Sequence, residues 1–202
     1  MKAPYPLILA SASRGRADLL RAAGFAFVQE PAGVPEPDPE TGTDPAGHAR
    51  RLARLKAEAA VPRHPGCLVL AADTVVACAG RILGKPRDAE DAVDMLAFLG
   101  GRPHTIVSAL CLGLLAPGRA PRFEAGEDRA EVTLRAWPRD RLREHVERVK
   151  PLFCAGAYAL QDGGSSIVAR IDGDPATVVG LPLDLLDRLL ARYCCGQAER
   201  VT

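Results

Sequence analysis

The chain has 202 residues, of which 48% are hydrophobic and 25% charged, and this length suits one domain or two small lobes around one core. Its 26 basic and 25 acidic residues leave a net charge of +1, which excludes the broad basic surface that holds nucleic acid or an anionic membrane nonspecifically. The apolar content excludes a disordered chain, and no apolar run approaches the roughly 20 residues needed to span a bilayer.

The N-terminal apolar stretch at 7–10 is shorter than the hydrophobic region of a signal peptide, which needs about 7–15 residues. The cysteines form no CxxC pair, and this favours buried thiols over a disulfide framework or a zinc site. They are Cys67, Cys78, Cys111, Cys154, Cys194 and Cys195. We therefore expect a cytoplasmic protein with neither a membrane nor a nucleic acid as its partner.

Helix and strand patterns alternate along the chain, which predicts an α/β fold with a mixed sheet. Asp44 followed by Pro45 marks a helix start, and Gly24 and Gly100 mark helix ends. Strands are predicted at 6–10, 67–78, 105–115, 129–136 and 165–171, with a short one at 177–179. Helices are predicted at 14–23, 45–60, 88–99, 138–149 and 182–193. Segment 30–44 is rich in Pro, Gly and acidic residues and is predicted to be a long, functional or mobile loop.

Asp73 and Thr74 interrupt an otherwise apolar run, CLVLAADTVVAC, which reads as a central strand buried on both faces. A lone buried carboxylate costs several kcal/mol unless it is paired or holds a metal. Asp73 is therefore either part of a turn or structural ion pair, or a carboxylate that binds a cation or activates water.

Lys56 lies near the middle of the apolar face of the predicted helix at 45–60. Its ammonium group either reaches solvent past small alanines or points inward at an anion. Lys85, in the turn Gly-Lys-Pro-Arg-Asp, reads alone as a solvated charge before a helix capped by Asp88.

The segment SASRGR follows the first strand and opens a helix, so its backbone N–H groups and side chains suit a phosphate. A tight strand-to-helix turn without a ligand needs similar small residues. Further along, Gln161 offers a donor and an acceptor for a base edge, although a surface glutamine is the commoner case. Phosphate and a divalent cation together would satisfy these side chains and Glu36 in the long loop. No P-loop or dinucleotide motif is present.

Six segments, in order from about residue 7 to residue 183, resemble the Maf family of nucleoside triphosphate pyrophosphatases. They are LILASASRGRADLLRAAG, EPAGVPE, AADTVV, ILGKPRDAEDAVDMLAFLGGRPHTIVSALCL, AGAYALQ and GDPATVVGLPL. The resemblance implies one domain over 1–202, with a mixed twisted sheet flanked by helices and two lobes around a cleft. It further implies hydrolysis of a nucleoside triphosphate to the monophosphate and pyrophosphate, a divalent cation (Mg²⁺, Mn²⁺ or Co²⁺) and a homodimer. The family is thought to remove noncanonical or excess nucleotides and is linked to septum formation.

By the same resemblance, Asp73 is the proton acceptor, and Asp73 with Glu36 is the candidate metal pair. Thr74 and Gln161 match positions associated with a preference for dTTP and UTP. The remaining substrate-binding residues match the first phosphate loop and the lysines of the cleft. They are Ser11, Ser13, Arg16, Lys56 and Lys85.

Three residues depart from the usual family pattern. Arg14 stands where proline is common and could replace the guanidinium lost at Gly15, where arginine is common. Cys154 stands where the pyrimidine branch usually has lysine, as in the branch that cleaves 7-methyl-GTP. A 7-methyl-GTP pyrophosphatase and a non-catalytic nucleotide sensor in cell division are therefore the alternative functions.

Overall fold

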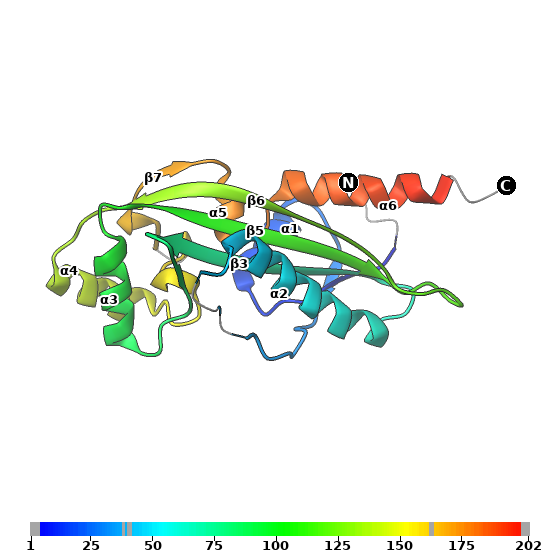
Figure 1. The fold of residues 1–202 in the computed structure, drawn as a ribbon, viewed down its shortest axis with the longest axis horizontal. Helices are drawn as coiled ribbons and strands as arrows, with labels where there is room; N and C mark the ends of the chain where they lie inside the picture. The colour runs from blue at the N-terminus through cyan, green and yellow to red at the C-terminus, as the bar shows by residue number, and fades with distance from the viewer. Residues whose placement is uncertain (1–4, 38, 40–41, 162–163, 199–202) are drawn as a thin grey trace.

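The computed structural model describes residues 5–37, 39, 42–161 and 164–198. Within these ranges, a mixed sheet of seven strands forms the centre of the molecule (Figure 1). The strands are β1 (Leu7–Leu9), β2 (Phe27–Gln29), β3 (Leu68–Cys78), β4 (Arg81–Leu83), β5 (Pro103–Leu114), β6 (Arg122–Leu134) and β7 (Val168–Asp172). Their order is β2-β1-β3-β5-β6-β7, with β4 paired to β3. β1 is parallel to both of its neighbours, and the remaining pairs are antiparallel.

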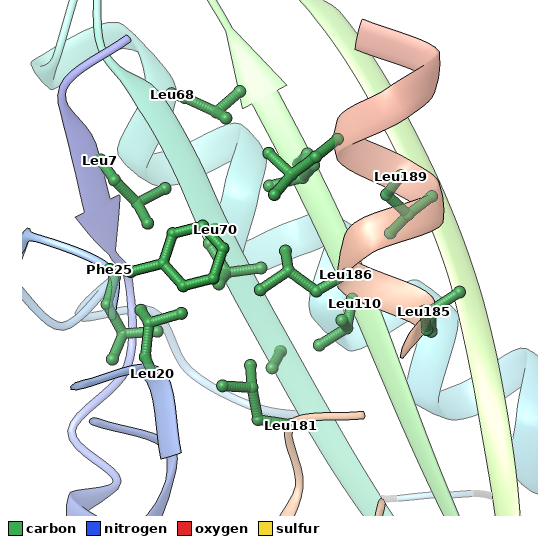
Figure 2. Close-up of a cluster of buried hydrophobic side chains, with 14 of the residues drawn as sticks. Leu7, Leu20, Phe25, Leu68, Leu70, Leu110, Leu181, Leu185, Leu186 and Leu189 are labelled. Carbon is green, nitrogen blue, oxygen red and sulfur yellow. The ribbon is translucent and has the colours of Figure 1, made fainter. Parts of the chain in front are cut away.

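Helices cover both faces of this sheet (Figure 1). They are α1 (Arg14–Ala22), α2 (Pro45–Ala60), α3 (Ala89–Leu99), α4 (Arg139–Val149), α5 (Pro175–Val179) and α6 (Leu183–Ala198). Leucines of α1 and α6 pack on one face, where Leu70 and Leu110 meet Leu20 and Leu186 (Figure 2). Small residues of α2, mostly alanines, pack on the other face. Helices α3 and α4 form a third apolar cluster with β6 at the far end of the sheet.

Alternation along β3 divides its side chains between the two faces, as the pleat of a strand requires. Leu70 and Ala72 belong to the cluster beneath α1 and α6. Val69, Ala71 and Val75 belong to the cluster beneath α2. Neighbouring residues of this strand therefore serve opposite sides of the molecule.

The predicted α/β class with a mixed sheet is confirmed, and helix α2 has the predicted bounds. Asp44 caps α2 and Asp88 caps α3 through their carboxylates, as predicted. The described part of the long loop at 30–44 contains neither helix nor strand.

The predicted strand at 177–179 is wrong, because these residues belong to helix α5. Asp174 accepts a hydrogen bond from the Ala176 N–H, and Pro175 occupies the first turn. This Asp-Pro start outweighs the β-branched run Thr-Val-Val that follows it. The helix ends at Gly180, whose φ of 105° disfavours any other residue.

Two strands of three residues, β2 and β4, lie outside the predicted set, and β6 begins at Arg122 rather than at 129. The first half of β6 is polar and half-buried, so it lacks the apolar alternation that marks a strand in a sequence.

Candidate active site

The candidate site lies beside the middle of β3, just beyond the point where its parallel neighbour β1 ends. The last β1 residue, Leu9, pairs with Leu70, and β4 joins β3 only at Val76. Within the described part of the chain, residues 71–75 of β3 therefore have a strand neighbour, β5, on one side only. Ligands of open α/β sheets bind at such interruptions next to the carboxyl end of a parallel strand.

On the α2 face, Asp73 and Lys56 form a buried ion pair. Lys56 Nζ donates to Asp73 Oδ1 at 2.7 Å, so the ammonium points inward rather than to solvent. The same Nζ lies 2.8 Å from Oε1 of Glu36, and the other oxygen of Glu36 lies 3.4 Å from Lys85 Nζ. Four of the residues predicted from the sequence are thus brought together as an array of alternating charge.

This array leads from the interior to the surface. Asp73 and Lys56 are buried, whereas the side chains of Glu36 and Lys85 are 38% and 55% exposed. A negatively charged ligand could therefore reach Lys85 from solvent and approach Lys56 past the Glu36 carboxylate.

Burial and charge act in opposite directions on the two carboxyl groups. Burial raises the pKa of Asp73 above its ordinary value, and the charge of Lys56 offsets this only in part. Burial also raises the pKa of Glu36, but the hydrogen bonds and charges of Lys56 and Lys85 together hold it below its ordinary value. The site therefore makes Asp73 a better proton acceptor, and Glu36 a poorer one, than each would be in water.

On the opposite face of β3, Thr74 and Arg16 form a second group. The Arg16 guanidinium donates to Thr74 Oγ1 at 3.0 Å and to the Ala72 carbonyl at 2.9 Å. It also donates to Ser11 Oγ and to the Gly180 carbonyl, both at 3.0 Å. Arg16 thus joins the segment after β1, strand β3 and the turn after α5, and it uses four of its five N–H donors within the protein.

Ser13 acts locally as the N-cap of α1. Its hydroxyl accepts from the Arg16 N–H at 3.3 Å, and its own N–H donates to Ser11 Oγ at 3.2 Å. The predicted strand-to-helix turn is therefore present at the end of β1. The side chain of Arg14, the first residue of α1, is 81% exposed and faces Asp18.

Gly15 explains how Gln161 reaches this region. A Cβ atom at Gly15 would lie 2.9 Å from Gln161 Cδ and even closer to Gln161 Nε2. The departure from arginine at this position thus leaves room for the Gln161 amide against the first turn of α1. Gln161 and the Arg16 group consequently lie at the same end of α1.

The segment before Gln161 is fixed by two hydrogen bonds. The Gly156 N–H donates to the carbonyl of Gly84, the residue before Lys85, at 3.0 Å. The Tyr158 hydroxyl lies 2.8 Å from Nε2 of His104, whose Nδ1 lies 3.1 Å from the Arg102 carbonyl. Since a carbonyl only accepts, His104 carries its proton on Nδ1, and Tyr158 donates to Nε2.

Asp73 and Glu36 are two carboxylates that share one ammonium group. Among the described residues, no cluster of three or more His, Cys, Asp or Glu side chains is arranged to hold a metal ion. A pair of carboxylates fits the usual way in which Mg²⁺ is bound, through one or two protein oxygens together with substrate phosphates. The donor set therefore fits a cation that arrives with a nucleotide.

Other features lie apart from this site. A pocket of about 160 Å³ on α4, lined by Trp137 and His145 among others, contains none of the residues predicted from the sequence. Cys67, Cys78 and Cys111 form no disulfide bond, and burial raises the pKa of the Cys111 thiol to about 12. The side chains of Cys194 and Cys195 lie outside the described set. No helix within the described ranges is both long enough and apolar enough to cross a membrane.

Sequence reasoning missed Ser108 and Thr177, which are fully buried and hydrogen bonded behind Thr74. One signal was available, because Ser108 interrupts the apolar run of β5 as Asp73 interrupts that of β3.

Comparison with known proteins identifies the family. Residues 6–193 match the family described as Maf-like protein. A dTTP/UTP pyrophosphatase of Oleidesulfovibrio alaskensis is 40% identical over 191 residues, which cover 94% of this chain and 86% of that protein. A dTTP/UTP pyrophosphatase of Myxococcus xanthus is 41% identical over 186 residues, covering 92% and 91% of the two chains.

Among solved structures, a HAM1 protein from Coxiella burnetii is 19% identical with a TM-score of 0.45, and the match covers 93% of this chain and 99% of that one. A nucleoside-triphosphatase, dITP/XTP pyrophosphatase, from Mycobacterium abscessus is 22% identical with a TM-score of 0.41 over the whole of both chains. The assignment rests on the sequence matches, which span nearly the whole chain at about 40% identity. The chain belongs to the Maf family.

Proposed function

We propose that this protein hydrolyses nucleoside triphosphates to the monophosphate and pyrophosphate, with dTTP and UTP as its preferred substrates. The observation that carries the proposal is the alternating array of Asp73, Lys56, Glu36 and Lys85 beside the open edge of β3. The names of the relatives at about 40% identity support the choice of reaction and of base.

The lysines supply the charge that a triphosphate requires. Each ammonium group has three donors, and within the array Lys56 uses two and Lys85 one. The spare donors, with the remaining N–H of Arg16 and the hydroxyls of Ser11 and Ser13, would neutralise and orient the phosphates. At 3.4 Å, the contact between Lys85 and Glu36 is the weakest of the array and the easiest for a phosphate to replace.

Asp73 would act as the general base. Its Oδ1 accepts from Lys56, which leaves Oδ2 for a proton of the attacking water. The water oxygen forms a bond to the α-phosphorus, the bond to the bridging oxygen breaks, and pyrophosphate leaves. A raised pKa makes Asp73 a better proton acceptor than an ordinary aspartate.

A divalent cation (Mg²⁺, Mn²⁺ or Co²⁺) would be held by Asp73 and Glu36 together with the phosphates. When bound, it would supply charge neutralisation at the phosphate oxygens and assist departure of pyrophosphate. Thr74 and Gln161, on the side of α1, would contact the base. The family resemblance also supports a single two-lobed domain and a cytoplasmic homodimer, which sedimentation and cell fractionation would test.

Cys154 favours a second substrate, 7-methyl-GTP, because the family branch that cleaves this nucleotide has cysteine at this position. The test is release of pyrophosphate and monophosphate from dTTP, UTP, CTP, GTP and 7-methyl-GTP, with each cation and with none. We expect turnover of dTTP and UTP that depends on the cation. Nucleotide binding without turnover would instead favour the sensor, and release of inorganic phosphate alone would refute the reaction.

A further inference from the structure

Three polar residues form a row across the sheet beneath α5. In the strand register, Thr74 of β3 lies opposite Ser108 of β5, and Ser108 lies opposite Asp128 of β6. The Ser108 side chain lies 2.9 Å from Thr74 Oγ1 and 2.7 Å from the backbone carbonyl of Thr177. Ser108 and Thr177 are completely buried, and buried polar groups of this kind are hydrogen bonded in native proteins.

The direction of each hydrogen bond in this row is fixed by counting protons. A carbonyl only accepts, so the single hydroxyl proton of Ser108 goes to Thr177. Ser108 therefore has no proton for Thr74, and Thr74 must donate to Ser108. Arg16, which only donates, supplies a hydrogen bond to Thr74 Oγ1 at 3.0 Å. The chain of donors thus runs from Arg16 through Thr74 and Ser108 to the Thr177 carbonyl.

This chain of hydrogen bonds, from Arg16 through Thr74 and Ser108 to the Thr177 carbonyl, is called the relay below. Further hydrogen bonds fix its last residue, Thr177, in place. The Thr177 hydroxyl donates to Asp128, and the Thr177 carbonyl also accepts from the N–H of Gly180 at 3.1 Å. Gly180 in turn allows close approach, because a Cβ atom there would lie 2.6 Å from Thr74 Oγ1 and 3.0 Å from Arg16 Nε. Thr74 cannot turn its hydroxyl around without breaking several buried hydrogen bonds.

A hydroxyl has one proton and two lone pairs. In Thr74 the proton is committed to Ser108 and one lone pair to Arg16, so the only capacity left is to accept one hydrogen bond. We infer that Ser108 is a positioning residue that fixes Thr74 as a pure acceptor, so that the site favours a base presenting an N–H over one presenting a lone pair. This inference rests on the proposed function, in which Thr74 faces the base.

Uracil and thymine present such an N–H at N3, whereas cytosine presents a lone pair at the same ring position. The relay therefore gives a physical reason for selecting uracil and thymine nucleotides against cytosine nucleotides. When cytosine is bound, its N3 lone pair faces the free lone pair of Thr74 Oγ1, and neither acceptor gains a hydrogen bond.

The test measures kcat/KM for UTP and for CTP, together with binding of the non-hydrolysable α,β-methylene forms of both nucleotides. In Ser108→Ala the Thr74 hydroxyl no longer donates to Ser108, so it can donate to the N3 atom of cytosine or accept from the N3–H of uracil. We expect the ratio of UTP to CTP to fall about tenfold, mainly through improved use of CTP. Ser108→Thr, which keeps the hydroxyl, should retain the wild-type ratio.

The matched control is Val107→Ala, the adjacent buried position on the opposite face of β5. It removes packing without touching the relay, so both substrates should change together and the ratio should stay constant. If Ser108→Ala does not fold, Ser108→Cys provides the second variant, because a thiol fills a similar volume but is a weak acceptor and holds the Thr74 proton less firmly. It should lower the same ratio by a smaller factor.

An unchanged ratio in both Ser108→Ala and Ser108→Cys, or a wild-type protein that uses UTP and CTP equally, would overturn the inference. A wild-type protein that binds the UTP analogue more tightly than the CTP analogue but cleaves neither substrate would overturn the proposed reaction and support the relay. The two failures are therefore distinguishable.

Discussion

Replacing Asp73 by asparagine separates its chemical role from its structural one. Asparagine keeps the shape of the side chain and an oxygen that can accept from Lys56 Nζ, now 2.7 Å from Asp73 Oδ1. What it removes is the negative charge and the capacity to take a proton from water. We therefore expect a large loss of turnover with little loss of stability.

The effect on stability follows from the direction of the pKa shift. Burial raises the pKa of Asp73 in the folded protein, so its favourable contribution is present only at low pH and is lost as the pH rises through that value. Ionising this buried carboxylate therefore costs stability, and asparagine, which cannot ionise, removes this cost. Against it, Lys56 loses one anionic partner but keeps Glu36 at 2.8 Å. The net change in the free energy of unfolding should stay within about 1 kcal/mol.

Lys56→Met is the informative contrast, because Lys56 is shared by both carboxylates. Its removal leaves Asp73 buried without its ammonium partner, and Glu36 keeps the longer contact with Lys85. Breaking a buried pair in this way costs about 3–5 kcal/mol. Urea denaturation of both variants should thus show a small change for Asp73→Asn and a large one for Lys56→Met.

The effect on activity is the loss of a general base, which is worth about 10²–10⁴-fold in rate. Pyrophosphate release from UTP, measured at saturating substrate, gives this factor directly, and binding of a non-hydrolysable analogue checks that the site is intact. Turnover within threefold of the wild type would refute the role of Asp73. An Asp73→Asn variant destabilised as strongly as Lys56→Met would refute the reasoning about its burial.

Two further predictions concern the surroundings of the site. Gly15→Ala should raise the stability of helix α1 by up to about 1 kcal/mol, which thermal melting would show. The same variant should increase KM for UTP up to about tenfold in steady-state kinetics, because the added Cβ displaces Gln161. An unchanged KM would exclude Gln161 from base recognition. Burial lowers the pKa of His104 and of His145, so the stability that these neutral rings contribute is present above the ordinary value of 6.5. It is lost as the pH falls below 6.5 through the lowered pKa values of the folded protein. The free energy of unfolding should therefore fall between pH 7.5 and pH 5.5. His104→Gln should show a shallower fall, because its amide can make the same two hydrogen bonds without titrating. An identical slope in that variant would contradict the lowered pKa of His104.

The residues of the charged array could be predicted because each one breaks a local pattern. Asp73 interrupts an apolar strand, and Lys56 lies on the apolar face of a helix. A buried charge is costly unless a partner compensates for it, so the sequence alone predicts that an acidic and a basic residue of this kind pair with each other. Their pairing at 2.7 Å follows from the packing of α2 on β3.

The relay behind Thr74 could not be predicted in the same way. Ser108 is small enough to pass for an ordinary core residue, and its meaning depends on the register between β3 and β5. Thr177 lies in a β-branched run that suggests a strand, and only the capping by Asp174 turns this run into a helix. A contact between residues more than 60 positions apart is set by tertiary packing, which local patterns do not contain.

The charged array around Asp73 and the relay around Thr74 lie on opposite faces of β3, because side chains alternate along a strand. Asp73 and Thr74 are adjacent in the chain, and alternation directs one toward α2 and the other toward α1 and α5. The α2 side gathers the acid and lysines that bond making and breaking require, while the other side holds a hydroxyl whose direction is fixed by buried hydrogen bonds. Among the described residues, the hydrogen bonds of Asp73 and those of Thr74 go to different side chains, so changes around Ser108 can alter the choice of base while the proton acceptor remains in place. This arrangement lets one stretch of β3 serve both catalysis and recognition.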